Sequence, residues 1–157
     1  GSKSKSGIIV KGIHDLAVRF SKCCSPVPGD EIVGFVTRGR GITIHRTDCI
    51  NVLNLPEIER SRLIDAEWQG IEEDNSAATY STEISIFANN RIGMFVDISK
   101  IFTEREIDIK TMNSRVNKQG KATITMSFDI HGIEELNNLM AKLRQIDGVL
   151  DIERTTG

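Results

Sequence analysis

Residues 79–88 read Thr79-Tyr80-Ser81-Thr82-Glu83-Ile84-Ser85-Ile86-Phe87-Ala88, which places Tyr80, Ile84, Ile86 and Ala88 on one face and mostly polar side chains on the other. Alternation of period two is typical of a strand with one buried face. After Asn89-Asn90-Arg91-Ile92-Gly93 the period changes, and an apolar stripe indicates a helix ending near Glu106: Met94, Phe95, Ile98, Ile101 and Phe102. This change of period predicts a strand, a loop and a helix in succession.

The rest of this half repeats the pattern. Residues 107–116 and 122–130 predict two strands joined by the turn Asn117-Lys118-Gln119-Gly120, and residues 149–154 predict a last one. A second helix between them carries its own apolar stripe: Ile133, Leu136, Leu139, Met140, Leu143 and Ile146. The order β-α-β-β-α-β predicts a ferredoxin-like sandwich, a four-stranded antiparallel sheet with both helices on one face.

The open face of this predicted sheet argues against two uses of the fold. RNA-recognition domains stack bases on aromatic residues of their central strands, but the outward residues of the third strand bear hydroxyls: Thr123, Thr125 and Ser127. Soft-metal chaperones need a cysteine pair in the first loop, and residues 79–157 contain no cysteine. A different use, the binding of an amino acid, therefore depends on the first loop.

Gly93 lets the backbone of that loop approach a ligand, and the free amides at the helix start can hold a carboxylate. Two interpretations of this loop remain open. Gly93 and its neighbours could form a ligand site, or Gly93 could be required only for its backbone conformation in a loop of solvent-exposed residues. Residues 79–157 nevertheless resemble an ACT domain, the amino-acid-sensing module. The family's loop has the pattern Asp-Arg-x-Gly-Leu. It resembles Asn90-Arg91-Ile92-Gly93-Met94 here, with Asn in place of Asp and Met in place of Leu. The resemblance implies an amino-acid ligand at these residues and homodimers formed by side-by-side sheets.

Length and charge indicate how the chain is divided. With 157 residues it has room for one domain or two small ones, and its short apolar runs exclude a membrane span. The net charge of −2 hides an asymmetry, since residues 1–50 carry eight basic and four acidic side chains, whereas residues 51–78 carry two and seven. We therefore expect a tag remnant and linker at 1–6, domains at 7–69 and 79–157, and an acidic linker at 70–78.

The first half holds the residues with metal-binding chemistry: Cys23, Cys24, His45 and Cys49. Three thiolates and an imidazole suit a closed tetrahedral zinc site, and the spacing of His45 and Cys49 can place both at the start of one helical turn. Adjacent cysteines in a strand point to opposite sides, so zinc requires a kink at Cys23-Cys24, which the prolines at 26 and 28 favour. The same residues also fit small cysteines buried for packing, and the odd number of cysteines fits a reducing cytoplasm.

A basic hairpin follows the cysteine pair. Residues 31–37 and 41–45 predict two strands joined by Arg38-Gly39-Arg40, and Arg46 lies on the returning strand. The guanidinium groups of such a tip can bind phosphate. Basic hairpin tips are also commonly exposed to solvent with no binding role. We further expect Thr47 or Asp48 to cap a short helix over 49–55, and a strand over 63–68 in which Trp68 packs on the core.

Taken together, three segments resemble one family, the long RelA/SpoT-type synthetases and hydrolases of guanosine tetra- and pentaphosphate. They are Phe20-Ser21-Lys22-Cys23-Cys24-Ser25-Pro26-Val27-Pro28-Gly29-Asp30, Val36-Thr37-Arg38-Gly39-Arg40-Gly41 and Ile44-His45-Arg46-Thr47-Asp48-Cys49. The resemblance implies the C-terminal regulatory region, a zinc-finger-like (ribosome-intersubunit) domain followed by ACT. The fold class expected is α+β, with a small β-rich first domain.

The resemblance also implies a function. The parent enzymes transfer pyrophosphate from ATP to GDP or GTP, and their catalytic domains, which use manganese or magnesium, lie N-terminal to this region. We expect the chain itself to be no enzyme but to dock on ribosomal RNA, beside deacylated tRNA, and to signal to those catalytic domains. The resemblance raises the expectation of structural zinc and of phosphate contacts by five basic residues: Arg19, Lys22, Arg38, Arg40 and Arg46.

Overall fold

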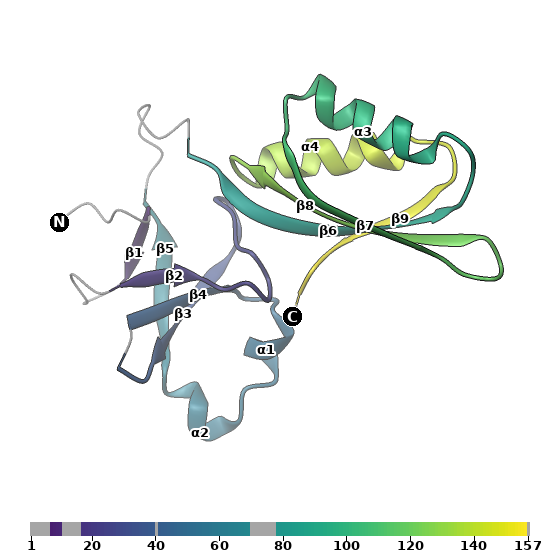
Figure 1. Ribbon diagram of the computed structural model, residues 1–157. Helices are drawn as coiled ribbons and strands as arrows, with labels where there is room; N and C mark the ends of the chain where they lie inside the picture. The colour runs from purple at the N-terminus through teal and green to yellow at the C-terminus, as the bar shows by residue number, and fades with distance from the viewer. Residues whose placement is uncertain (1–6, 11–16, 40, 70–77, 157) are drawn as a thin grey trace. The chain divides into compact units, whose positions relative to one another are not determined.

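The computed structural model describes residues 7–10, 17–39, 41–69 and 78–156, and it divides the chain into two compact units between Ala78 and Thr79 (Figure 1). The expected tag remnant at 1–6, nearly all of the expected linker and Arg40 lie outside the described residues. In the part described, no helix is both long and apolar enough to cross a membrane. Each unit has its own sheet.

The first unit is built on a five-stranded sheet in the order β1-β5-β3-β4-β2. Strand β2 runs parallel to β4, and the other neighbours are antiparallel. The bounds of the elements are β1 Ile8–Val10, β2 Val18–Phe20, β3 Ile32–Thr37, β4 Gly41–Arg46, α1 Ile50–Leu53, α2 Glu57–Arg60 and β5 Leu63–Trp68. The predicted hairpin and the predicted strand at 63–68 are thus confirmed, whereas β1, β2 and α2 were not predicted.

The two faces of this sheet have different roles. One face bears the main core, in which Ile8, Val10, Ile42 and Ile44 are buried and Trp68 stacks on Phe20 at 5.6 Å. The opposite face bears a smaller cluster of buried residues, Cys24, Cys49 and Val52, packed against Val33. Val33 is in register with His45, so β3 and β4 present the histidine to the cysteine side of the sheet.

Short helix α1 begins after Cys49, which is its N-cap residue in extended conformation and makes no side-chain capping bond. The prediction that Thr47 or Asp48 caps this helix is therefore wrong. The prediction that His45 and Cys49 share one helical turn is also wrong, because His45 lies on β4 and a turn separates it from α1. The residues still converge, since the turn after β4 brings the chain back over the same face of the sheet.

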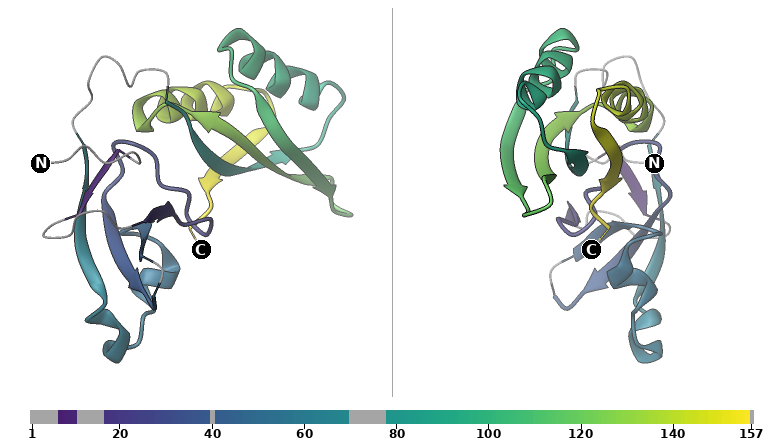
Figure 2. Two further views of the ribbon diagram at one scale, coloured as in Figure 1. Left: turned by 60° about the vertical axis from the view of Figure 1, so that its left-hand side comes forward. Right: turned by 90° about the vertical axis from the view of Figure 1, so that its right-hand side faces the viewer.

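The second unit has the predicted β-α-β-β-α-β order and a four-stranded antiparallel sheet, β7-β8-β6-β9. Figures 1 and 2 show both helices on one face of this sheet, the ferredoxin-like arrangement. The bounds are β6 Tyr80–Asn89, α3 Met94–Glu104, β7 Ile109–Val116, β8 Lys121–Ile130, α4 Ile133–Arg144 and β9 Val149–Arg154. The fold class is α+β, as predicted.

Its core forms between the helices and the alternate residues of β8. These strand residues are buried, and the ring of Phe128 meets that of Phe102 edge to face at 5.0 Å. One detail differs from the prediction: Phe95, assigned to the apolar stripe of α3, is 41% exposed. Met112 on β7 is 38% exposed. Strand β7 is an edge strand whose side chains the helices cover only at its start, so its apolar residues remain accessible.

Candidate metal centre

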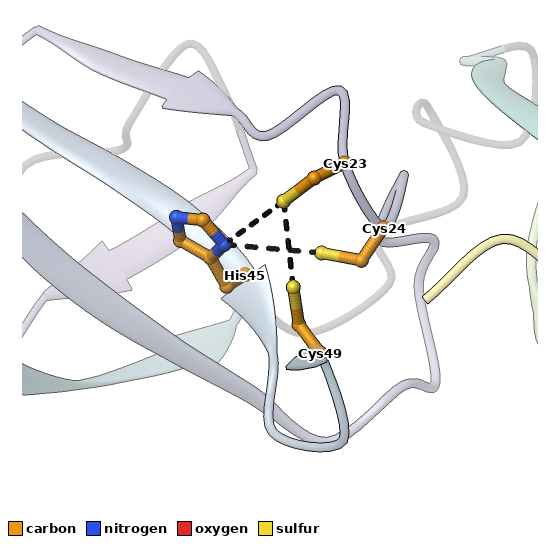
Figure 3. A group of neighbouring side chains, drawn as sticks. All are labelled: Cys23, Cys24, His45 and Cys49. Atoms are coloured by element: carbon orange, nitrogen blue, oxygen red, sulfur yellow. Dashed lines mark hydrogen bonds between the residues drawn. The ribbon is translucent and has the colours of Figure 1, made fainter. Parts of the chain in front are cut away.

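The four predicted metal ligands come from three separate segments of the first unit. Cys23 and Cys24 lie in the turn that follows β2, His45 lies near the end of β4, and Cys49 is the N-cap residue of α1. Figure 3 shows the three sulfur atoms and Nδ1 of His45 pointing toward a common centre. The structure therefore brings together all four residues that the sequence singled out.

The kink that a shared site demands of two adjacent cysteines is present. The amide of Ser25 donates to the carbonyl of Ser21 at 3.0 Å, which closes a tight turn around Cys23 and Cys24. Ser25 has a φ of 48°, in the left-handed region that non-glycine residues seldom occupy. In this turn the two neighbouring side chains leave the backbone toward the same side, which an extended strand would not allow.

The distances fit a tetrahedral metal ion. All four ligand atoms lie within 4.8 Å of one another. The Cys23 sulfur is 3.4 Å from that of Cys49 and 3.5 Å from Nδ1 of His45, and the Cys24 sulfur is 4.0 Å from the same nitrogen. Zinc bond lengths imply tetrahedron edges of roughly 3.8 Å between sulfurs and roughly 3.5 Å between sulfur and nitrogen. Three sulfurs and one nitrogen at this spacing are a donor set that suits zinc.

Burial sets the protonation of these groups. It raises the pKa of the Cys24 thiol to about 12 and also raises the pKa of Cys49. Burial acts in the same direction on Cys23, but hydrogen bonds outweigh it, first among them one from Ser21, so the pKa of that thiol is lowered. Burial lowers the pKa of His45, which keeps its imidazole neutral and able to ligate near neutral pH. A bound cation would reverse the preference of the two neutral thiols, because a coordinating thiol is deprotonated.

Two further residues support the ligands, and the sequence reasoning did not assign them this role. The Oγ of Ser21 lies 2.7 Å from the sulfur of Cys23. The backbone amide of Arg46 donates to the sulfur of Cys24 at 3.2 Å, and its guanidinium donates to the Cys24 carbonyl at 3.4 Å and pairs with Asp48 at 2.6 Å. Outer partners of this kind orient metal ligands. Their position in the sequence could have indicated this role, because each lies one or two residues from a predicted metal ligand.

The residues predicted to contact RNA occupy different environments. Arg46 is only 7% exposed and supports the cysteine turn, which is not the position that phosphate contact requires. Arg19 on β2, Lys22 beside the cysteine pair and Arg38 at the β3–β4 turn are all exposed. They are spread along the unit rather than clustered, because Arg19 is in register with Thr43 in the middle of β4, whereas Arg38 lies at the hairpin tip. Arg40 is outside the described residues.

The predicted ligand loop of the second unit is well formed. Gly93 has a φ of 84° and is the N-cap residue of α3, with no side-chain capping bond. Arg91 is held in place, donating to the Asp147 carbonyl at 2.8 Å and pairing with Asp97 at 2.7 Å. Asn90 and Ile92 are exposed, whereas Met94 is fully buried in the core. Any ligand at this loop would therefore meet the backbone around Gly93 rather than the side chain of Met94.

Comparison with known proteins agrees with both units. A family model described as the RelA/SpoT RIS domain matches residues 8–69, and a model of the ACT domain matches residues 76–154. The crystal structure of the ACT domain from the GTP pyrophosphokinase of Chlorobium tepidum matches with a TM-score of 0.44 and 26% identity, over 49% of this chain and 99% of that one. The two family models define a regulatory region made of a RIS domain followed by an ACT domain.

Curated relatives with the name GTP pyrophosphokinase match almost the whole chain. The Escherichia coli K12 protein is 36% identical over 157 residues, which are 99% of this chain and 21% of that protein. The Haemophilus influenzae protein is 35% identical over 153 residues, 97% of this chain and 20% of that protein. The chain belongs to the RelA/SpoT family and corresponds to the C-terminal region of its GTP pyrophosphokinases, which confirms the resemblance found in the motifs. It spans about a fifth of the length of these relatives.

Proposed function

We propose that this region docks on ribosomal RNA, on a ribosome carrying deacylated tRNA, and relays that state to the catalytic domains of a GTP pyrophosphokinase. The observation that carries the proposal is the match of residues 8–69 to the RIS domain, the same unit that holds the Cys3His centre and exposed basic residues. The enzymatic transfer of pyrophosphate from ATP to GDP or GTP would belong to catalytic domains elsewhere, together with their manganese or magnesium. The region itself would bind and signal in the cytoplasm.

In this proposal the metal centre is a structural zinc site. It would join three segments, the turn after β2, the end of β4 and the start of α1, which are otherwise linked by the pairing of β2 with β4 and by hydrogen bonds of Arg46 to Cys24 and Cys49. The cluster they form contains few buried apolar side chains, Val52 chief among them, so packing alone contributes little there. Zinc bound to Cys23, Cys24, His45 and Cys49 would fix the surface that those segments present.

The basic residues proposed for phosphate contact are Arg19, Lys22 and Arg38, together with Arg40 by its sequence position. Arg19 alternates with Val18 and Phe20, which pack on the main core, so its side chain lies on the other face of the sheet. No ion pair holds Arg19, Lys22 or Arg38 within the described part of the chain. Basic side chains without ion-pair partners on a folded surface suit contact with the phosphate backbone of RNA. Such contacts position the protein on RNA but do not read its sequence.

The test is ribosome binding measured by co-sedimentation at several salt concentrations. The Arg38→Ala/Arg40→Ala variant is expected to bind more weakly and to show a shallower dependence on salt, by roughly 0.7 to 0.9 in log–log slope for each phosphate that the variant no longer neutralises. Arg105→Ala, which removes an exposed arginine of the second unit, is the matched control and should bind like the parent chain. Equal affinity and equal slope for the double variant and the control would refute the proposal.

A second candidate function, amino-acid sensing, is favoured by the uncapped start of α3 at Gly93, whose amides can hold a carboxylate. Asn90, Arg91, Ile92, Gly93 and Met94 would form this site, the last through its backbone. Calorimetry with a panel of amino acids, branched-chain ones first, should show saturable binding, and a flat response across the panel would contradict it. An ACT homodimer is part of the same hypothesis, and light scattering should then give twice the 17.5 kDa mass of one chain.

A further inference from the structure

A groove lined mainly by polar and charged residues lies on the open face of the sheet of the second unit, away from the helices. It has a volume of about 360 Å³ and follows the ends of β7 and β8 at their hairpin. Its lining residues are Asn113, Arg115, Val116, Asn117, Lys121, Thr123 and Thr125. None of them belongs to the loop at Gly93, so the groove is separate from the site proposed for an amino acid.

The register of the sheet explains how the groove is built. Arg115 on β7 is directly opposite Thr123 on β8, and Asn113 is directly opposite Thr125. Residues that are directly opposite in an antiparallel pair share a face, with Cβ atoms about 5 Å apart. Because the neighbouring residue Ile124 is fully buried against the helices, both threonines must lie on the open face. An arginine, two hydroxyls and an amide therefore project from one small area.

The groove is positively charged and has no carboxylate among its lining residues. Arg115 forms no ion pair within the described residues, and the ammonium of Lys121 donates to the side-chain oxygen of Asn89. The other carboxylates of this face lie outside the groove: Glu83 on β6 and Asp129 on β8 are farther along those strands, and Asp151 and Glu153 lie on β9, with Asp151 directly opposite Phe87. An oxyanion would suit this groove, because its guanidinium and ammonium have no acidic partners there and lie beside hydroxyl donors. The planar guanidinium favours phosphate among such anions.

One aromatic residue adjoins this area. Phe87 on β6 is directly opposite Thr123, so Phe87, Thr123 and Arg115 form a single row across three strands of the open face. Phe87 is half-buried, which leaves part of its ring accessible. With strands about 4.8 Å apart, the Cα atoms of Phe87 and Arg115 are separated by roughly 10 Å. That span leaves room for a ribose between a base on the ring and a phosphate at the guanidinium.

We infer that this face of the second unit binds a phosphorylated nucleoside. Arg115 and Lys121 contact the phosphate, the hydroxyls of Thr123 and Thr125 contact the ribose, and Phe87 supports the base. Base stacking on an aromatic ring tolerates any base, so the site selects for phosphate and ribose rather than for sequence. The same chemistry is offered by a free nucleotide and by a segment of single-stranded RNA, and the two sources are distinguished below.

The experiment is a titration of the ¹⁵N-labelled 157-residue chain, followed through the backbone amides of β6, β7 and β8. The probes are adenosine 5′-monophosphate, adenosine, inorganic phosphate and hexauridylate. Saturable shifts confined to these strands are expected with the monophosphate and are expected to be at least about tenfold weaker with adenosine. Tighter binding of hexauridylate than of the monophosphate would assign the site to RNA, and the reverse order would assign it to a free nucleotide.

Variants test the named contacts. Arg115→Gln should weaken binding of the monophosphate about tenfold. Arg105→Gln, which replaces an exposed arginine at the end of α3, should leave this affinity unchanged. Phe87→Leu should weaken the monophosphate but not inorganic phosphate, a split that a folding defect would not produce. The inference is overturned if neither phosphorylated probe gives saturable shifts, if adenosine binds as well as its monophosphate, or if the two arginine variants behave alike. Because these readouts need no ribosome, their failure is distinct from that of the docking proposal.

Discussion

Removal of zinc is expected to unfold the first unit and to leave the second folded. The four ligand atoms are contributed by the turn after β2, by β4 and by α1, so the loss of the ion releases three segments at once. The second unit has its own core between the sheet and the two helices and contains no cysteine. A chelator such as 1,10-phenanthroline should therefore act on one half of the chain only.

The expected magnitude follows from the size of the unit. A domain over residues 8–69 would have a stability of about 3–9 kcal/mol if it behaved like an ordinary globular domain. Structural zinc in small domains contributes an apparent binding free energy of about 10–16 kcal/mol near neutral pH. Since the contribution of the metal exceeds the whole stability of such a domain, the free energy of unfolding of the metal-free unit should be near or below zero.

Trp68 allows the two units to be followed separately. It is the only tryptophan of the chain, it stacks on Phe20, and its indole donates to the Asp30 carbonyl at 3.0 Å. Chelation should shift its emission to longer wavelength, while the far-ultraviolet signal of α3 and α4 should persist. Added zinc should restore the emission. Cys24→Ser should resemble the chelated protein, and Ser99→Ala, a change in α3, should not.

One result would refute this reasoning. If elemental analysis shows that zinc has been removed and yet the emission of Trp68 and the thermal transition of the first unit are unchanged, the ion does not hold the segments together. The four residues would then be packing residues, as the sequence alone also allowed. The absence of zinc from protein purified without chelator would lead to the same conclusion.

Three other predictions concern single side chains. Arg46→Gln should lower zinc affinity by about 10- to 100-fold in competition with a chelating dye, because the guanidinium that holds the Cys24 carbonyl is removed, while Arg105→Gln should not. Gly93→Ala should destabilise the second unit by about 1–2 kcal/mol in urea unfolding, because its φ of 84° is unfavourable with a Cβ, while Asn90→Ala should stay within about 0.5 kcal/mol. Ile124→Ala, at a fully buried position, should cost about 2–5 kcal/mol, and an equally large loss for the fully exposed Ile92→Ala would contradict this assignment of core and surface.

The sequence was informative where local pattern and tertiary burial agree. Burial alternates along both ten-residue strands β6 and β8, and the sequence follows it closely in β8 and over most of β6, where Thr82 and Phe87 are the exceptions. It was less informative for β7, where Met112 and Val116 alternate correctly but lie on an edge strand that the helices do not cover. Hydrophobic period predicts which residues share a face, but not whether another element covers that face.

The first unit was harder to predict for a different reason. Strands β1 and β2 have three residues each, too few for a period to emerge, and both are held by pairing with distant strands. The ligand set was predictable because cysteine and histidine carry their chemistry in any conformation. The positive φ of Ser25 and the burial of Arg46 were not, since both result from the turn that the whole site imposes.

The arrangement of β4 connects the metal centre with the proposed docking surface. Ile42 and Ile44 of this strand pack on the main core, while His45 faces the metal centre on the other side, and the parallel neighbour β2 leads directly into the cysteine turn. Arg19 is on β2 and Lys22 adjoins Cys23, so the positions of both depend on segments that the ion would hold. Loss of zinc would therefore abolish docking even though none of the four metal-binding residues contacts RNA. Loss of Arg38 at the far tip would weaken docking and leave zinc bound, and these two signatures separate the structural role of the metal from the electrostatic role of the surface.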